Sequence, residues 1–215
     1  KNIVNIGSAD IIGTGISAAF WFYLAIQISP DSFGELHYLL SIVGVVAYFS
    51  LIGTQNTITV YVAKKIPIQS TFNLISLIIG SVAFVLLYLL FQRIDIGFLV
   101  LGYIINNLAI GALLGKREYK NYFKYILIQK SLTPILGLSL FFIFGIEGII
   151  YGLAFSYVAF SLIILKSFKE IKIDFTLLHG KKEFIISNYF NSLSGTLHGQ
   201  IDKIIVMPIL GAAVV

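Results

Sequence analysis

Long apolar stretches of about twenty residues alternate with short polar segments along the whole chain. A helix that rises about 1.5 Å per residue needs about twenty residues to cross a hydrocarbon core of roughly 30 Å. Strands of a membrane β-barrel are about half that length and alternate in polarity, unlike these stretches. The pattern therefore predicts an all-α polytopic membrane protein, a helical bundle with spans over residues 10–28, 36–61, 72–91, 96–114, 125–144, 149–165 and 184–207.

Basic residues occupy every second gap between the predicted spans. The remaining gaps are short and acidic, with Arg93 as their one cation. Because Lys and Arg are enriched in cytoplasmic loops, the cation-rich gaps and the N-terminus are predicted to be cytoplasmic. The cations of these gaps are Lys1, Lys64, Lys65, Lys116, Arg117, Lys120, Lys124, Lys166, Lys169, Lys172, Lys181 and Lys182.

Composition narrows the classes of partner and cofactor. The chain is 58% hydrophobic and 12% charged, too apolar for a soluble domain, so the lipid bilayer is its first predicted partner. The net charge of +5 follows from the cytoplasmic gaps, and no nucleic-acid partner is predicted. Cysteine is absent, and His37, His179 and His198 are not spaced as metal ligands, so we predict no metal and no cofactor.

The longest gap, residues 166–183, separates six predicted spans from the seventh. Phe168, Ile171, Phe175 and Leu178 recur in it at spacings of three and four, which predicts a short amphipathic helix in the inner interface. An ordinary polar linker is the alternative. The predicted organisation is a six-helix bundle over 1–165, a cytoplasmic linker over 166–183, and the first helix of a second bundle over 184–215.

A weak internal repeat supports this division. Shifting the chain by 182 residues places Gly13-Thr14 on Gly195-Thr196. Six intervening spans are an even number, so both copies enter the membrane in the same direction. Parallel repeats of this kind are one of the internal symmetries of secondary transporters.

Several short motifs carry a family resemblance. They are Ser29-Pro30-Asp31-Ser32-Phe33-Gly34-Glu35-Leu36, Gly53-Thr54-Gln55-Asn56-Thr57, Gly115-Lys116-Arg117-Glu118-Tyr119, Gly145-Ile146-Glu147-Gly148 and Gln200-Ile201-Asp202-Lys203. With them the chain resembles the Wzx-type polysaccharide flippases, of the superfamily that also holds the MATE multidrug exporters.

The resemblance implies two bundles around a central cavity, of which this chain would be the first bundle and the opening helix of the second. It implies a plasma-membrane transporter that moves a lipid-linked oligosaccharide from the inner to the outer leaflet by alternating access. Enzymes of polysaccharide synthesis are a further class of expected partner.

Polar residues within the spans are the candidate site, because polar groups in a membrane are costly unless they meet water or a partner. Asn188, Asn191, Gly195, His198 and Asp202 share one face of the seventh span. We predict that this stripe lines a cavity, with hydrogen bonding between helices as the alternative. Asp202 is the candidate for ion coupling, although its neighbour Lys203 fits snorkelling to the headgroups.

Other spans supply three further candidates. Lys130 shares a face with Thr133, Pro134 and Gly137, and a cavity-facing lysine would suit the diphosphate of a lipid-linked sugar. Snorkelling to the inner interface would account for Lys130 equally well. Asn56 and Asn107 could meet sugar hydroxyls or bond to neighbouring helices.

Three classes of function remain after this reading. No catalytic residues are predicted, because no nucleophile has an accompanying base and the outer gaps are too short for an enzyme site. A MATE-like cation-coupled exporter of small molecules would need an acidic cavity. A non-transporting scaffold of a polysaccharide-synthesis complex would have its polar stripes packed dry against other helices.

Overall fold

The computed structural model describes residues 2–211, so Lys1 and the last four residues of the predicted second-bundle segment lie outside the described part. Within it, all regular structure is helical, as the sequence predicts. In chain order the elements are α1 (Asn2–Gln27), α2 (Pro30–Ser50), α3 (Gln55–Ala63), α4 (Gln69–Phe91), α5 (Ile94–Gly115), α6 (Tyr119–Phe144), α7 (Ile146–Ser156), α8 (Val158–Glu170), the 3₁₀ turn η1 (Phe175–Leu178) and α9 (Lys182–Leu210).

Six helical segments of the described chain are long and apolar enough to cross a membrane: Ile6–Gln27, Pro30–Ala63, Gln69–Phe91, Ile94–Gly115, Tyr119–Phe144 and Ile146–Glu170. Large apolar side chains cover their outer surfaces. Ile26 is 80% exposed and Leu90 is 76% exposed. Exposing so much apolar surface to water is unfavourable, whereas contact of this surface with lipid tails is favourable. The chain is therefore an all-α polytopic membrane protein.

Two of the six spans are broken, which corrects the prediction of continuous helices over 36–61 and 149–165. The second span pauses between Ser50 and Gln55, where α2 ends and α3 begins. The sixth pauses at Tyr157, between α7 and α8. The polar residues Thr54 and Gln55 lie at the first break, but a membrane helix can carry such residues, and the break at Tyr157 lies among mostly apolar residues. Hydropathy therefore does not predict either break.

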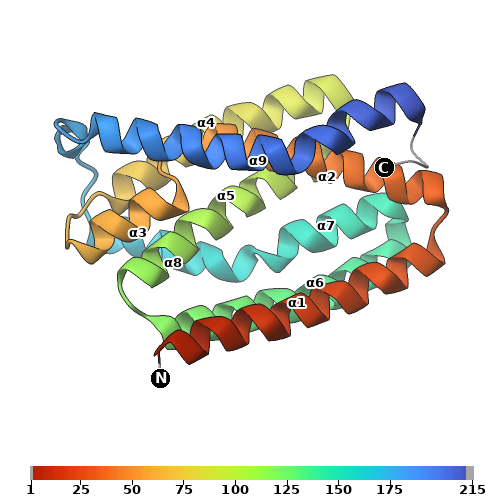
Figure 1. Ribbon diagram of the computed structural model, residues 1–215, viewed down its shortest axis with the longest axis horizontal. Helices are drawn as coiled ribbons and strands as arrows, with labels where there is room; N and C mark the ends of the chain where they lie inside the picture. The colour runs from red at the N-terminus through yellow and green to blue at the C-terminus, as the bar shows by residue number, and fades with distance from the viewer. Residues whose placement is uncertain (1, 212–215) are drawn as a thin grey trace.

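The seventh predicted stretch forms α9, which packs along α2 (Figure 1). It is less apolar than the other six and is not among the six segments that are long and apolar enough to cross a membrane. That α9 crosses the membrane stays a prediction.

The prediction of a single short helix in the 166–183 linker is wrong. Helix α8 continues to Glu170, Ile171 is extended, and only the four-residue turn η1 follows before α9. The carboxylate of Asp174 accepts hydrogen bonds from the backbone N–H (2.8 Å) and the hydroxyl (2.6 Å) of Thr176. Such local bonds compete with a continuous helix.

Helix α5 runs diagonally through the middle of the bundle (Figure 1). In an 18-residue apolar segment of α5, 67% of residues are buried, against 22% in the corresponding segments of α1, α4 and α6. Helices α1 and α6 pack side by side on one flank, and α2 and α9 lie on the other. The described cation-bearing connections, α3–α4, α5–α6 and α8–α9, gather at one end of the bundle together with the start of α1.

Candidate functional site

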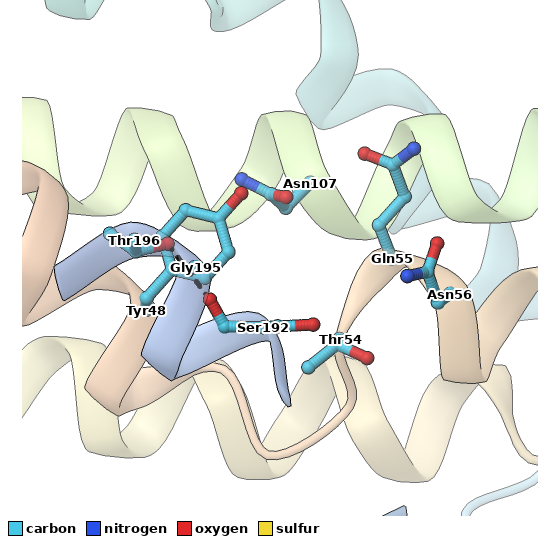
Figure 2. Close-up of a pocket in the computed structure, with 8 residues that line it drawn as sticks. All are labelled: Tyr48, Thr54, Gln55, Asn56, Asn107, Ser192, Gly195 and Thr196. Atoms are coloured by element: carbon cyan, nitrogen blue, oxygen red, sulfur yellow. Dashed lines mark hydrogen bonds between the residues drawn. The ribbon is translucent and has the colours of Figure 1, made fainter. Parts of the chain in front are cut away.

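A polar cavity of about 300 Å³ opens at the break in the second span. Figure 2 shows its lining residues, which come from α2, the break itself, α3, α5 and α9. We call it the polar cavity, and it is defined by Tyr48, Thr54, Gln55, Asn56, Asn107, Ser192, Gly195 and Thr196. Seven of these eight residues carry a hydroxyl or an amide.

The break is fixed by a glycine and a threonine. A Cβ atom on Gly53 would collide with the ring of Phe72, so only glycine lets the chain pass this close to α4. Thr54 then caps α3, because its Oγ1 accepts a hydrogen bond from the backbone N–H of Thr57 (3.4 Å). Thr54 is 2% exposed, and this capping residue forms part of the wall of the polar cavity.

Close packing of α3 on α5 positions Asn107. At Gly111 a Cβ atom would lie 2.8 Å from the carbonyl oxygen of Gln55, and Thr59 Oγ1 donates a hydrogen bond to the Gly111 carbonyl (3.2 Å). Small residues commonly allow such approaches between membrane helices. Asn107 lies one turn before Gly111 on the same face of α5. Its Nδ2 donates to the Tyr103 carbonyl (3.1 Å), leaving its Oδ1 available to the cavity.

Helix α9 forms the remaining wall. The Tyr189 hydroxyl donates a hydrogen bond to the Phe49 carbonyl (3.0 Å), one of the acceptors that the end of α2 leaves without a helical partner. Ser192, one turn further along α9, and Thr196, two turns further, line the cavity together with Gly195 (Figure 2). Thr196 Oγ1 donates to the carbonyl of Ser192 (3.0 Å), which leaves its lone pairs free as acceptors.

The polar cavity has no charged side chain in its lining. Its one fixed electrostatic feature is the start of α3, where the backbone N–H groups of Gln55 and Asn56 have no acceptor among residues 2–211. The partial positive charge of a helix start favours electron-rich ligand atoms. The cavity is thus equipped to hydrogen-bond a neutral, oxygen-rich ligand, and its lining offers no carboxylate, imidazole or amine for proton transfer.

The structure brings together two of the seven candidate residues. Asn56 and Asn107 line the polar cavity. Asn188 lies on α9 outside it and donates to the Phe184 carbonyl of its own helix (2.9 Å). The rest of the α9 candidates, Asn191, His198 and Asp202, are exposed on a different side of that helix from Ser192 and Thr196.

Lys130 lies on the opposite flank, at the contact of α6 with α1. Its side chain packs over Gly13, with its Cγ 3.1 Å from where a Cβ atom on Gly13 would be. One turn earlier in α1, the Asp10 carboxylate accepts a hydrogen bond from the Tyr122 hydroxyl (2.8 Å). Lys130 is therefore half-buried in the contact between α1 and α6, near the Asp10–Tyr122 hydrogen bond and apart from the polar cavity.

Sequence reasoning missed Tyr48, Ser192 and Thr196 as lining residues. Ser192 and Thr196 are four residues apart and share a face of α9 next to the stripe of Asn188, Asn191, Gly195, His198 and Asp202, so this spacing was the signal that could have identified them. Tyr48 gave no signal, because aromatic residues are common near helix ends in membranes.

Comparisons with known proteins leave the family of this chain open. Searches against protein-family models, curated proteins and solved structures find no significant match to it.

Proposed function

We propose that this protein is a membrane transporter that carries a lipid-linked oligosaccharide between leaflets, and that the polar cavity binds part of the sugar. The observation that carries this proposal is an uncharged cavity of hydroxyls and amides at a broken membrane helix. Sugar hydroxyls both donate and accept hydrogen bonds, as do the side chains of Asn, Gln, Ser, Thr and Tyr. The resemblance to Wzx-type flippases supports the same substrate class.

The depth of the cavity suits translocation. Thr54 lies nine residues before Ala63, about 14 Å from the cation-bearing end by helical rise. Asn107 lies eight residues before Gly115, about 12 Å from that end. In a hydrocarbon core of roughly 30 Å both residues are near the middle of the membrane. Broken helices at this depth are a feature of substrate sites in secondary transporters.

The chemistry of the cavity argues for a saccharide over the alternatives. A MATE-like exporter of cations would need a carboxylate in its cavity, and the lining has none. A scaffold would have its polar residues packed dry, whereas these side chains surround about 300 Å³ of space. That volume is at the lower limit of ligand pockets, roughly 300–1,000 Å³, and suits one sugar residue of a longer substrate.

Alternating access would require the second bundle that the resemblance implies. In this proposal α9 is the first helix of that bundle, and Ser192 and Thr196 bring its side of the cavity to the first bundle. The carrier diphosphate would lie elsewhere, because the cavity offers it no cation. Lys130 keeps its proposed role toward the diphosphate only as a separate site on the α1–α6 flank. Ion coupling through Asp202 likewise stays a proposal.

The test is equilibrium binding of a radiolabelled polyprenyl diphosphate that carries one hexose to the purified chain in detergent. We expect Asn56→Ala/Asn107→Ala to weaken binding at least about fivefold and up to about 160-fold, since each of two lost hydrogen bonds contributes about 0.5–1.5 kcal/mol. Asn191→Ala is the matched control, because Asn191 is exposed on α9 outside the cavity.

Two ligand controls accompany these variants. The same lipid without its sugar should bind equally to the parent chain and to the double variant. Tetraphenylphosphonium represents the cations that a MATE-like exporter would carry. If sugar-bearing and sugar-free lipids bind with equal affinity, the polar cavity is not a saccharide site; if only the cation binds, the exporter alternative replaces it.

A further inference from the structure

A second hollow lies at the cation-bearing end of the bundle, between the end of α5, the start of α6 and the last turns of α8. It measures about 170 Å³ and we call it the inner crevice. Its rim carries Lys116, Asn121, Tyr125 and Lys166, and its floor includes Leu162 and Ile163. The inner crevice shares no lining residue with the polar cavity.

The two lysines approach the rim from different helices. Lys116 follows the last residue of α5 and has no carboxylate within 4.0 Å among residues 2–211. Lys166 lies one turn before the end of α8, with its side chain 70% exposed and its Nζ 3.7 Å from Glu170. Exposed pairs of this kind contribute little, so the ammonium remains available to a stronger anion. The carboxylate of Glu118, which also borders the crevice, accepts a hydrogen bond from Asn121 Nδ2 (2.7 Å).

The floor of the crevice lies within a membrane span. Leu162 is 61% exposed within the sixth span, so its side chain faces the hydrocarbon core. Lys116 and Lys166 lie at the ends of their spans, at the level of the lipid headgroups. Cations and hydroxyl or amide donors thus stand directly above apolar side chains, in the order in which a phospholipid presents phosphate and acyl chain.

We propose that the inner crevice binds an anionic phospholipid, with its phosphate between Lys116 and Lys166 and the start of an acyl chain over Leu162 and Ile163. The Tyr125 hydroxyl and the Asn121 amide are the neutral donors beside the phosphate. Basic hollows between membrane helices commonly bind anionic headgroups. The apolar floor favours a lipid over a free phosphate ion, because a soluble anion would leave the exposed side chain of Leu162 without an apolar partner.

Binding of such a lipid would tie α5, α6 and α8 together at the headgroup level. Helix α5 is the central helix of the bundle and carries Asn107 of the polar cavity. The proposal does not depend on the saccharide proposal, because a resident phospholipid would bind here whatever the protein transports.

Native mass spectrometry of the purified chain, titrated with phosphatidylglycerol, tests the site. Each lysine near a lipid surface contributes a factor of about five in affinity, so Lys116→Gln/Lys166→Gln should bind phosphatidylglycerol about twenty-five-fold more weakly. Lys64→Gln/Lys65→Gln is the matched control, because it removes the same charge from two exposed lysines at the same end, outside the crevice. This control should retain the affinity of the parent chain, as should Lys116→Arg/Lys166→Arg.

Two further ligands distinguish the possible sources of the phosphate. Phosphatidylcholine, which has no net charge, should bind the parent chain and the crevice variant equally. Millimolar inorganic phosphate should not displace phosphatidylglycerol; displacement would identify a soluble-anion site instead. Equal losses of affinity in the crevice and control pairs would show a diffuse charge effect and overturn the proposal.

Discussion

At the scale of single residues, the candidate site depends on two glycines, whose lack of a side chain matters as much as the side chains that line the cavity. Gly53 leaves room for Phe72, and Gly111 leaves room for the Gln55 carbonyl. These absences let α3 begin inside a membrane span and approach α5. The cap of Thr54 on Thr57 then satisfies one of the N–H groups that the break frees.

Replacing Gly53 with alanine should destabilise the protein. The backbone φ of Gly53 is not in the left-handed region, so the effect comes from crowding against Phe72 alone. Overpacking a well-packed site costs about 1–3 kcal/mol. The free energy of unfolding, measured by denaturant titration in detergent, should fall by that amount. Adding Phe72→Leu should recover part of the loss, since neighbouring substitutions are coupled.

Gly15→Ala provides the control for this substitution. A Cβ atom on Gly15 would meet no atom within 4 Å, and alanine is the better helix former. Its free energy of unfolding should be unchanged or slightly higher. An equal loss in both variants would show that the break does not depend on the contact with Phe72.

Asp174 gives a pH-dependent prediction outside the spans. The hydroxyl and the backbone N–H of Thr176 donate to its carboxylate and hold its pKa below the usual 3.8. Because the folded pKa is depressed, this contribution to stability is present in full above pH 3.8 and is lost as the pH falls through the folded value. In a carboxyl NMR titration, Thr176→Val should move the pKa of Asp174 up toward 3.8, whereas Thr176→Ser should leave it depressed.

At the scale of elements, the ends of α2, α4 and α5 are held together by one arginine. Arg93 Nε and Nη2 donate to the two oxygens of the Asp95 carboxylate (3.2 and 2.6 Å), and Arg93 Nη1 lies 3.7 Å from Glu35. Burial opposes the charge of Arg93, but its hydrogen bond with Asp95 and the attraction of Asp95, Glu147 and Glu35 outweigh that cost and raise its pKa. The cluster thus links the α4–α5 connection to the first turns of α2.

Asp95→Asn should therefore loosen this end of the bundle. The Asp95 side chain is 2% exposed, so its loss of charge leaves Arg93 half-buried with a weaker partner. Hydrogen bonds to charged groups contribute about 1.5–3 kcal/mol, and we expect a loss of that order in the free energy of unfolding. Asp31→Asn is the control, because Asp31 is exposed and has no ion pair among the described residues. Equal stabilities of the two variants would contradict a structural role for the Arg93 cluster.

The sequence predicted the positions of the first six apolar spans better than their internal geometry. Hydropathy registers the transfer of side chains into lipid, and that signal is strong over twenty residues. The break at Gly53 depends instead on a contact with Phe72 in another helix, which no local pattern contains. For the same reason Asn56 and Asn107 were identifiable as polar groups in spans, but their meeting with Ser192 and Thr196 of α9 was not.

At the scale of the whole molecule, the described cation-bearing connections lie at one end of the bundle and the α1–α2 connection at the other (Figure 1). Arg93 pairs with Glu35 in the first turns of α2, so its cluster lies near that second end. Such an asymmetry predicts the orientation, with the N-terminus in the cytoplasm. It also bears on α9, which begins at the cation-bearing end and runs along α2 toward the opposite one (Figure 1). If α9 spans, its polar exposed face, with Asn191, His198 and Asp202, must meet water or protein within the membrane.

The native chain has no cysteine, so single cysteines can report on both questions. In right-side-out vesicles, a membrane-impermeant maleimide should label Asp31→Cys but reach Lys120→Cys only after permeabilisation. If α9 spans the membrane, Gly211→Cys should behave like Asp31→Cys and His179→Cys like Lys120→Cys. Labelling of Gly211→Cys only after permeabilisation would place both ends of α9 on the same side. That result would remove α9 from the set of spans, and with it the wall that Ser192 and Thr196 give to a cavity near the middle of the membrane.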